Sequence, residues 1–347
     1  MLGLGMSVVN TATTIARMFR RMEFKDKVVV ITGGSRGLGL VLARKFAKEN
    51  AKLVLIARDT EELEAAEKEL QDKGVEAHII VCDVTVQKDV IAAMDSVIEQ
   101  MGQIDVLINN AGVIQVGPMD SMTVDDFKVA LDNHFWAPLY SALAVTPHMR
   151  EKKSGRIVNI SSIGGKISVP HLLPYTASKF ALVGLSEGLR HELMQDNIFV
   201  TTVCPGLMRT GSHVNADFKG QHKLEYALFS TINSLPFISS GAEKAADEII
   251  NACRFGDAEL IITTPAQFAA KFRALFPQAT ADTLGTISRF LPKTGGIGTN
   301  SKTGKQSQSE FSPSPLTYLA DKAAEENNEE LKSPKNTELK EPAAEMA

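Results

Sequence analysis

Tyr175 and Lys179 are the residues of this sequence whose types and spacing most clearly suggest chemistry. They lie four residues apart in the segment YTASK, at the start of a predicted helix. Residues at this spacing share one helix face, so the phenol and the ammonium point the same way. A free tyrosine has a pKa near ~10, and a neighbouring cation lowers that pKa because it favours the phenolate. The pair therefore predicts a group that exchanges a proton with a substrate oxygen.

Two further polar residues are candidates to assist this pair. Ser162 follows the predicted strand Arg156–Ile160 and precedes Tyr175 by thirteen residues. A hydroxyl there can donate to a substrate oxygen and stabilise its developing negative charge. Asn133, in the segment LDNHF, is the other candidate. Its alternative interpretation is a residue at a helix bend whose amide is satisfied by backbone groups, and both roles can hold together.

The segment VVVITGGSRGLGLVLARKFAKEN has the pattern of a strand, a glycine-rich turn and a helix. Gly33, Gly37 and Gly39 allow a tight turn and let backbone N–H groups approach a pyrophosphate. The positive end of the following helix also favours an anion. Glycines placed between a Val-rich strand and an amphipathic helix predict a dinucleotide-binding turn.

Strand-like apolar runs alternate with helical patterns from Lys27 to about Thr264. The apolar residues are continuous, as in strands that are covered on both faces. This order predicts an α/β fold, with one Rossmann-type domain over residues 25–264 and a doubly wound parallel sheet of about seven strands. The predicted strands are Val28–Thr32, Leu53–Ile56, Ala77–Val81, Val106–Asn109, Arg156–Ile160, Phe199–Val203 and Leu260–Ile262. The intervening helices include Thr60–Lys73 and Val86–Met101, followed by Gly74 and Gly102 as left-handed C-caps.

Together these motifs resemble the short-chain dehydrogenase/reductase family. The glycine turn has the spacing TGxxxGxG from Thr32, the segment NNAG starts at Asn109, and a serine precedes YxxxK by thirteen residues. The resemblance covers roughly Lys27 to Thr264. It implies hydride transfer between a nicotinamide cofactor and a carbonyl/alcohol pair, with no need for a metal.

The resemblance also implies a role for each catalytic candidate. Tyr175 is the acid/base, and Lys179 lowers its pKa and holds the ribose hydroxyls of the cofactor. Ser162 is favoured over its neighbour Ser161, because the second serine of such a pair is the catalytic one in the family. Asn133 matches the asparagine that holds a water linking Lys179 to solvent.

Cofactor-binding residues are carried over by the same motifs. In the family, the residue corresponding to Asp83 hydrogen-bonds near the adenine ring, the small residues of NNAG let the backbone pass close to the cofactor, and Pro205-Gly206 lies beside the nicotinamide. Thr210 is expected to bond the carboxamide or a phosphate. The full predicted set is Thr32, Gly33, Ser35, Arg36, Gly37, Leu38, Gly39, Arg58, Asp83, Val84, Asn110, Ala111, Gly112, Tyr175, Lys179, Pro205, Gly206 and Thr210.

The residues near the end of the second strand predict NADP(H). An NAD site places a carboxylate there, but this position is Ala57, followed by Arg58. Arg36 lies inside the glycine turn, and two guanidinium groups can clamp a 2′-phosphate. Two alternatives stay open: Arg58 projects into solvent, or Asp59 reaches the ribose if the strand end is shifted.

Composition sets the limits for partners and compartment. The formal net charge of −4 does not suggest nucleic acid as the main partner. Cys82, Cys204 and Cys253 are too few for a disulfide framework and have no zinc spacing, so we expect buried thiols in a reducing compartment. No segment is long and apolar enough to span a bilayer. We therefore expect a cytoplasmic protein, with membrane association as an open alternative, and a homo-oligomer.

The N-terminal residues 1–24 predict an amphipathic helix. One face would carry Ser7, Asn10, Thr14, Arg17 and Arg21, and the other Val8, Ala12, Ile15, Phe19 and Met22. Such a helix can lie on a membrane surface, or pack on its own domain or on a second subunit. The sequence favours neither alternative.

Three C-terminal segments complete the chain. Residues His213–Ser240 are rich in large apolar side chains and suggest a pocket for a lipophilic alcohol or ketone. The alternative is that these side chains pack on residues 267–291 or contact a membrane together with the N-terminal helix. Residues 265–291 predict a helical extension of one or two helices. Residues 292–347 are predicted to be a disordered tail, because they have few large apolar residues to offset the entropy of ordering. Within the tail, Ala320–Leu331 is predicted to form a transient helix.

The function predicted from the sequence is an NADP(H)-dependent oxidoreductase that interconverts a carbonyl and an alcohol, in the direction of reduction, on a small lipophilic molecule. The alternative is a non-catalytic cofactor-binding scaffold or sensor that binds partners through its terminal extensions. The intact Tyr175, Lys179 and Ser162 argue against that alternative.

Overall fold

Continuous runs of Val, Ile and Leu form a seven-stranded, fully parallel sheet in the computed structural model, which describes residues 14–310 and 312–330. The strand order is β11-β7-β6-β4-β1-β2-β3. The chain therefore runs outward from β1 to β3, crosses back to β4 on the other side of β1 and runs outward again to β11, which is the doubly wound arrangement. The strands are β1 (Val28–Thr32), β2 (Lys52–Ala57), β3 (Ala77–Val81), β4 (Val106–Asn109), β6 (Gly155–Ile160), β7 (Ile198–Pro205) and β11 (Glu259–Ile262).

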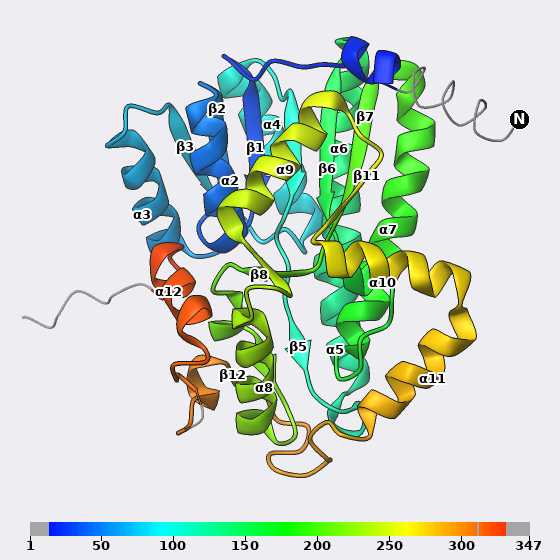
Figure 1. The fold of residues 1–347 in the computed structure, drawn as a ribbon. Helices are drawn as coiled ribbons and strands as arrows, with labels where there is room; N and C mark the ends of the chain where they lie inside the picture. Colours follow the sequence, from blue (N-terminus) through cyan, green and yellow to red (C-terminus); the bar gives the residue numbers. More distant parts are fainter. Residues whose placement is uncertain (1–13, 311, 331–347) are drawn as a thin grey trace, which may run out of the picture.

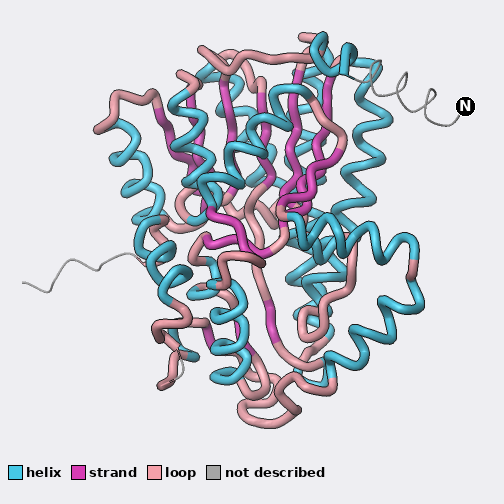
Figure 2. The backbone as a smooth tube through the Cα atoms, in the orientation of Figure 1, coloured by secondary structure: helices cyan, strands magenta, loops and turns pink. Residues whose placement is uncertain are grey.

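Helices cover both faces of this sheet (Figure 1, Figure 2). One apolar core joins the sheet to α2 (Gly37–Lys48), α3 (Thr60–Gln71) and α9 (Ala242–Phe255). A second core joins the opposite face to α4 (Gln87–Met101), α6 (Ala137–Glu151) and α7 (Leu173–Leu193). The predicted fold class and the seven strands are confirmed, with strand ends displaced by at most two residues.

Two details differ from the sequence prediction. Strand β3 lies at the edge of the sheet and is only partly covered, with Val81 53% exposed. Gly102 is the left-handed C-cap of α4, as predicted. Gly74 is also left-handed, but α3 ends at Gln71, so Gly74 belongs to the turn beyond the helix.

A smaller lobe lies beyond the carboxyl ends of the strands. It holds a sheet of order β12-β9-β5, a β8–β10 pair and α8. Phe218 and Tyr226 are fully buried in the core of this lobe, whereas Phe237 is 92% exposed. The elements are β5 (Gln115–Val116), β8 (Leu207–Arg209), β9 (Asp217–Phe218), α8 (His222–Ser234), β10 (Ser239–Gly241) and β12 (Lys302–Thr303).

The helical extension consists of two helices, α10 (Thr264–Leu275) and α11 (Pro277–Ser288), which project from the body beside α7 (Figure 1). Ala266 and Thr280 are their buried residues. The apolar segment 213–240 packs on other elements: α8 contacts α12 (Tyr318–Glu326), β8 and β9. Phe218 and Tyr226 of this segment are therefore buried within the smaller lobe. They are not buried by packing on residues 267–291, which was the predicted alternative.

The predicted start of the disordered tail at residue 292 is wrong. Residues 292–310 and 312–330 pack on the domain, and α12 lies beside α8 (Figure 1). Small side chains make this possible, because Ala320, Ala323 and Ala324 are buried where larger residues would not fit. The prediction from composition failed for this segment, because its order comes from the close packing of small side chains and from hydrogen bonds rather than from large apolar residues. Residues 331–347 lie outside the described residues.

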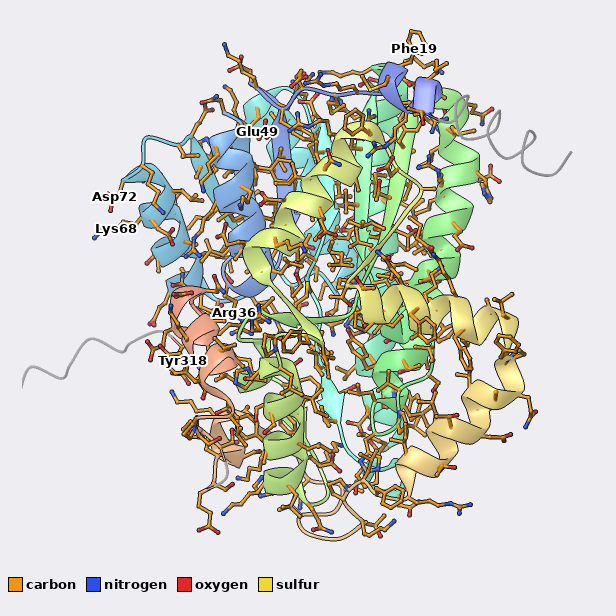
Figure 3. The ribbon with its side chains drawn as sticks, in the orientation of Figure 1. Phe19, Arg36, Glu49, Lys68, Asp72 and Tyr318 are labelled. Carbon is orange, nitrogen blue, oxygen red and sulfur yellow. The ribbon has the colours of Figure 1, made fainter. Side chains whose placement is uncertain are left out.

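Residues 14–19 are helical, and they contact the domain through the polar face of the predicted N-terminal helix. Arg17 donates to both carboxylate oxygens of Asp257, at 2.7 and 2.8 Å, and its guanidinium lies 4.2 Å from the centre of the Phe255 ring. On the opposite face Phe19 is 88% exposed (Figure 3). Within the helical residues, packing on the own domain thus uses Arg17 and leaves Ile15 and Phe19 exposed, whereas Met22, beyond this helix, is buried in the core. Val8 and Ala12 lie outside the described residues.

Within the described part of the chain, no helix is long and apolar enough to cross a membrane. Among the same residues, no three His, Cys, Asp or Glu side chains are grouped as ligands for a metal ion.

Candidate active site

Tyr175 and Ser162 are brought together by the connection from β6 to α7. Tyr175 lies in the first turn of α7, and Ser162 follows the end of β6. Gly164 lies between them: its N–H donates to Ser162 Oγ at 3.0 Å, and a Cβ atom there would lie 3.2 Å from Tyr175 Cε1. A hydrogen bond joins the Ser162 hydroxyl to the phenol and acts to lower the pKa of Tyr175.

The two neighbouring serines have different tasks. The buried Ser161 hydroxyl donates to the carbonyl oxygen of Lys179 at 3.1 Å, which fixes α7 against the sheet. The Ser162 hydroxyl faces Tyr175 instead. Ser161, and not Ser162, lines the cavity beside Tyr175 and Lys179, so the choice of Ser162 stays a prediction that rests on its contact with Tyr175.

Lys179 is buried one helical turn beyond Tyr175. Its ammonium donates to the carbonyl oxygen of Ile160 at 2.8 Å and lies 5.6 Å from the centre of the Tyr175 ring. Burial lowers the pKa of Lys179 to about 7. Burial also raises the pKa of Tyr175, and this effect exceeds the opposing effect of Ser162. Among the protein's own groups, the net direction for Tyr175 is therefore opposite to the one that the Tyr/Lys spacing predicted.

Asn133 lies in a π-helical turn, Asp132–Trp136, between α5 (Val124–Leu131) and α6. Its amide donates to the carbonyl oxygen of Val129 at 2.9 Å. Single π turns within helices frequently occur at functional sites. Asn133 is thus a residue at a helix irregularity, and it also lines the same cavity as Tyr175 and Lys179.

His134 was missed by the sequence analysis. It is fully buried, and its ring lies edge-on to Tyr175. The Val113 N–H donates to its Nε2 at 3.2 Å, and its Nδ1 pairs with Ser178 Oγ at 2.8 Å. Its position directly after Asn133 was the only available signal. No motif indicated that it would contact the tyrosine.

The glycine turn after β1 is held by side chains from two strand ends. Thr32 Oγ accepts from the N–H groups of Asn110 and Ala111, at 3.0 and 3.2 Å. The Asn110 amide donates to the carbonyl oxygens of Thr32 and Gly33. A Cβ atom on Gly39 would lie 1.9 Å from the Gly33 oxygen, so only glycine permits this approach of helix to turn.

A cavity of about 480 Å³ extends from this turn to Tyr175, across the ends of β1 and β4. This is the switch point of the sheet, where open α/β folds bind their ligands. The open backbone of the turn and the cavity fit a dinucleotide. The predicted residues that line the cavity are Gly33, Ser35, Arg36, Gly37, Leu38, Arg58, Val84, Asn110, Ala111, Gly112, Asn133, Tyr175, Lys179 and Thr210. The predicted residues outside its lining are Thr32, Gly39, Asp83, Ser162, Pro205 and Gly206.

Several of these outer residues support the cavity wall. The Asp83 carboxylate accepts from the N–H and the hydroxyl of Thr85, at 3.0 and 2.7 Å. The Gly206 N–H donates to the carbonyl oxygen of Ile262 at 3.0 Å. Thr210, four residues further along, reaches the cavity itself.

The predicted phosphate clamp is divided between a paired and an exposed arginine. Arg36 donates to Glu62 at 2.6 Å and lies 3.4 Å from the carboxylate of Glu329. Arg58 is exposed at the end of β2. Asp59 caps α3, because its carboxylate accepts from the Glu62 N–H at 2.9 Å. Neither glutamate was anticipated, since Glu62 looked like an ordinary helix residue and Glu329 lay in the presumed tail.

Known proteins share this sequence family and this fold. The family model for short chain dehydrogenases matches residues 27–219. A Bacillus subtilis protein, the uncharacterized oxidoreductase YxnA, is 32% identical over 74% of this chain and 71% of its own length. A dehydrogenase/reductase SDR family protein 7-like from Anopheles gambiae is 37% identical over 60% of this chain and 68% of its own length.

Two solved structures show the same architecture. L-sorbose reductase from Gluconobacter frateurii, complexed with NADPH and L-sorbose, is 27% identical, with a TM-score of 0.63 over 70% of this chain and 97% of that one. An NAD⁺-bound xylitol dehydrogenase is 30% identical, with a TM-score of 0.59 over 70% and 99%. This chain belongs to the short-chain dehydrogenase/reductase family. It is an oxidoreductase acting on an alcohol/carbonyl pair, with a nicotinamide dinucleotide of the NAD or NADP type as the cofactor typical of the family.

Proposed function

We propose that this chain is an NADP(H)-dependent oxidoreductase that reduces a carbonyl to an alcohol, with Tyr175 as the acid/base. The observation that carries the proposal is the convergence of Tyr175 and Lys179 at the wall of the cavity that begins at the glycine turn, with the Ser162 hydroxyl hydrogen-bonded to Tyr175. NADP(H) supplies the hydride when bound.

In this proposal Tyr175 gives its phenolic proton to the substrate oxygen during reduction and recovers it from Lys179 or solvent. Ser162 donates to the same oxygen and stabilises its negative charge. Lys179 holds ribose hydroxyls, and with its pKa near 7 it can supply or accept a proton near neutral pH. Asn133 connects this lysine to solvent.

The preference for NADP(H) rests on charge at the end of β2. Arg58 and Asp59 both line the cavity there, but Asp59 is held as the cap of α3 through one carboxylate oxygen, whereas no side chain holds the exposed Arg58 in place among the hydrogen bonds of the described residues. A guanidinium can bind a 2′-phosphate with paired hydrogen bonds. The NADPH complex of the related L-sorbose reductase agrees with this choice, and the NAD⁺ complex of xylitol dehydrogenase is the competing precedent.

The test is NADPH oxidation by the full chain across a panel of ketones and aldehydes of increasing lipophilicity. Tyr175→Phe should lower turnover by roughly 10²–10⁴-fold, the usual contribution of an acid/base group. It should leave NADPH binding little changed, and Tyr140→Phe on α6 serves as the matched control. Turnover that survives Tyr175→Phe would refute the mechanism, and a flat response across the panel would refute a lipophilic substrate.

We also propose a homo-oligomer and a peripheral membrane contact, each from exposed apolar residues. Val129, Trp136 and Leu143 are 44%, 42% and 55% exposed along α5, the π turn and α6. Sedimentation equilibrium tests the oligomer, and a monomer at micromolar concentration would exclude it.

The membrane contact is proposed from α10. There Phe268 is 69% exposed near the basic residues Lys271 and Arg273, a combination suited to an anionic bilayer.

A further inference from the structure

The chain segment that follows α12 lies directly on the glycine turn. We call residues 327–330 the C-terminal arm. The Gly37 N–H, part of the turn, donates to the carbonyl oxygen of Asn327 at 2.8 Å. The Asn328 amide lies 3.5 Å from the carbonyl oxygen of Ser35. The arm therefore engages the backbone that a dinucleotide's pyrophosphate would approach.

Glu329 carries a carboxylate into the cavity at this point. The residue is 8% exposed and lines the same cavity as Tyr175 and Lys179. Its Oε2 accepts from the Asn215 amide at 2.7 Å and lies 3.4 Å from Arg36 Nε (Figure 3 labels Arg36, beside α12). A Cβ atom on Gly37 would lie 2.5 Å from Oε1, so the carboxylate rests against the bare Cα of the turn.

The charges at the turn are unusual for a site that takes a phosphorylated ligand. Arg36 faces two carboxylates, Glu62 at 2.6 Å and Glu329 at 3.4 Å. The backbone N–H groups at the start of α2 and the Arg36 guanidinium are the groups that favour an anion here. Glu329 already pairs with Arg36, while the Gly37 N–H is taken by the carbonyl oxygen of Asn327 in the same arm. We propose that Glu329 is an internal anion of the cofactor site, which competes with the cofactor's phosphate groups for Arg36 and for the space against Gly37.

The arm is anchored at one end, so it can leave the turn without unfolding the domain. Helix α12 is fixed by its buried alanines, and Gly211, with φ +92°, admits it: a Cβ there would lie 2.3 Å from Ala324 Cα. Asp321 adds a hydrogen bond with His213 Nε2 at 3.2 Å. Within the described residues, those that would have to move are the four beyond the helix end, 327–330.

The environment of Glu329 also makes its carboxylate easy to displace. Burial raises the pKa of Glu329, and the nearby Glu62 acts in the same direction, whereas Arg36, Asn215 and His213 oppose the rise. The ionised carboxylate is thus held where burial disfavours it. Moving it into water regains solvation that the arm gave up on docking.

This inference rests on the proposed function, because it concerns the same cofactor site. The test is direct binding of NADPH and of NADH to the full chain, measured by calorimetry without substrate. Glu329→Gln keeps the size and hydrogen-bonding capacity of the side chain and removes its charge. We expect it to tighten NADPH binding by roughly fivefold or more, within the usual range of coupling between competing groups. Glu326→Gln, an exposed carboxylate at the end of α12, is the matched control and should leave the dissociation constant unchanged.

Two results would overturn the role of Glu329. Unchanged affinity in Glu329→Gln would show that the carboxylate does not compete, and weakened affinity would make Glu329 a ligand of the cofactor. A second measurement uses the wild-type chain: hydrogen exchange of the amides at 327–330 should accelerate when NADPH saturates the protein, and unchanged or slower exchange would also overturn the proposal. The preference of the wild-type chain for NADPH or NADH follows from its own two dissociation constants and does not involve the Glu329→Gln variant. A preference for NADH would refute the proposed cofactor without bearing on Glu329.

Discussion

His134 lies edge-on to Tyr175, with ring centroids 5.4 Å apart and ring planes at 87°. The Val113 N–H donates to Nε2, so Nδ1 carries the hydrogen and donates to Ser178 Oγ, which in turn donates to the carbonyl oxygen of Tyr175 at 2.8 Å. Burial holds the pKa of His134 well below its usual range, with Lys179 acting in the same direction. The neutral His134 ring therefore contacts the Tyr175 ring directly and the Tyr175 backbone through Ser178, so both parts of the tyrosine are held by one buried residue.

Replacing His134 by Phe should destabilise the protein by about 1–3 kcal/mol, because the buried Val113 N–H loses its acceptor while the edge contact to Tyr175 is kept. Urea unfolding of the two proteins measures this difference. Ser178→Ala removes one neighbouring hydroxyl and leaves the Val113 bond intact, so its effect should be smaller. Equal stability of His134→Phe and wild type would contradict the assigned bond.

Lys179 should make the stability rise with pH above neutrality. Its pKa is about 7 in the folded protein and near ~10.4 in the unfolded chain. Between these values the unfolded chain binds a proton that the folded protein does not. The free energy of unfolding therefore increases with pH, by up to about 1.4 kcal/mol per pH unit. Below pH 7 both states hold the proton, and this contribution no longer changes.

Urea unfolding at pH 7 and at pH 8.5, for wild type and Lys179→Met, checks this dependence. Burial raises the pKa of Cys82 to about 11 and that of Cys204 and Cys253 to about 12, so these thiols reduce stability as the pH rises through the range where unfolded thiols ionise. The comparison of the two proteins cancels this effect. Identical pH slopes would contradict a buried, low-pKa lysine.

Arg58→Ala should weaken NADPH binding by about tenfold or more and NADH binding much less, because the exposed guanidinium is available to a 2′-phosphate. Fluorescence titration with each cofactor gives the two dissociation constants. Lys68→Ala, another exposed cation on the neighbouring α3, controls for the general loss of positive charge. Equal losses with both cofactors would rule out the 2′-phosphate clamp.

The projecting helices α10 and α11 should bind anionic lipid vesicles. Phe268 and Phe290 are 69% and 84% exposed, so the double substitution by Ser should reduce co-sedimentation with such vesicles, and added salt should reduce it further. Leu224→Ser, an exposed apolar residue on α8, is the control. Wild-type protein that stays in the supernatant would remove the membrane contact from the proposal.

Local sequence patterns predicted the parts of the fold that local physics determines. Seven apolar runs became the seven strands, since a strand covered on both faces needs a continuous apolar segment whatever its neighbours are. The glycine turn and the Tyr175/Lys179 pair were predictable for the same reason: short spacing fixes their geometry. His134, Glu62 and Glu329 were not, because their roles depend on residues far away along the chain.

The C-terminal arm shows this limit most clearly. Ala320, Ala323 and Ala324 give little hydrophobic signal, and the order of residues 318–330 depends on a glycine at position 211 that leaves room for the helix. The carboxylates that face Arg36 were not predicted for the same reason. The prediction for Arg36 considered only the glycine turn, whereas Glu329 comes from the other end of the sequence.

The position of Glu329 in the chain also sets an order of events during synthesis. The glycine turn, Arg36 and the strands around them are translated long before residues 327–330, and domains begin to fold while the chain is still growing. A nascent protein thus has a complete nucleotide-binding half with nothing resting on Gly37. The arm is therefore made only after the turn that it covers, and the turn is open until translation reaches residue 327.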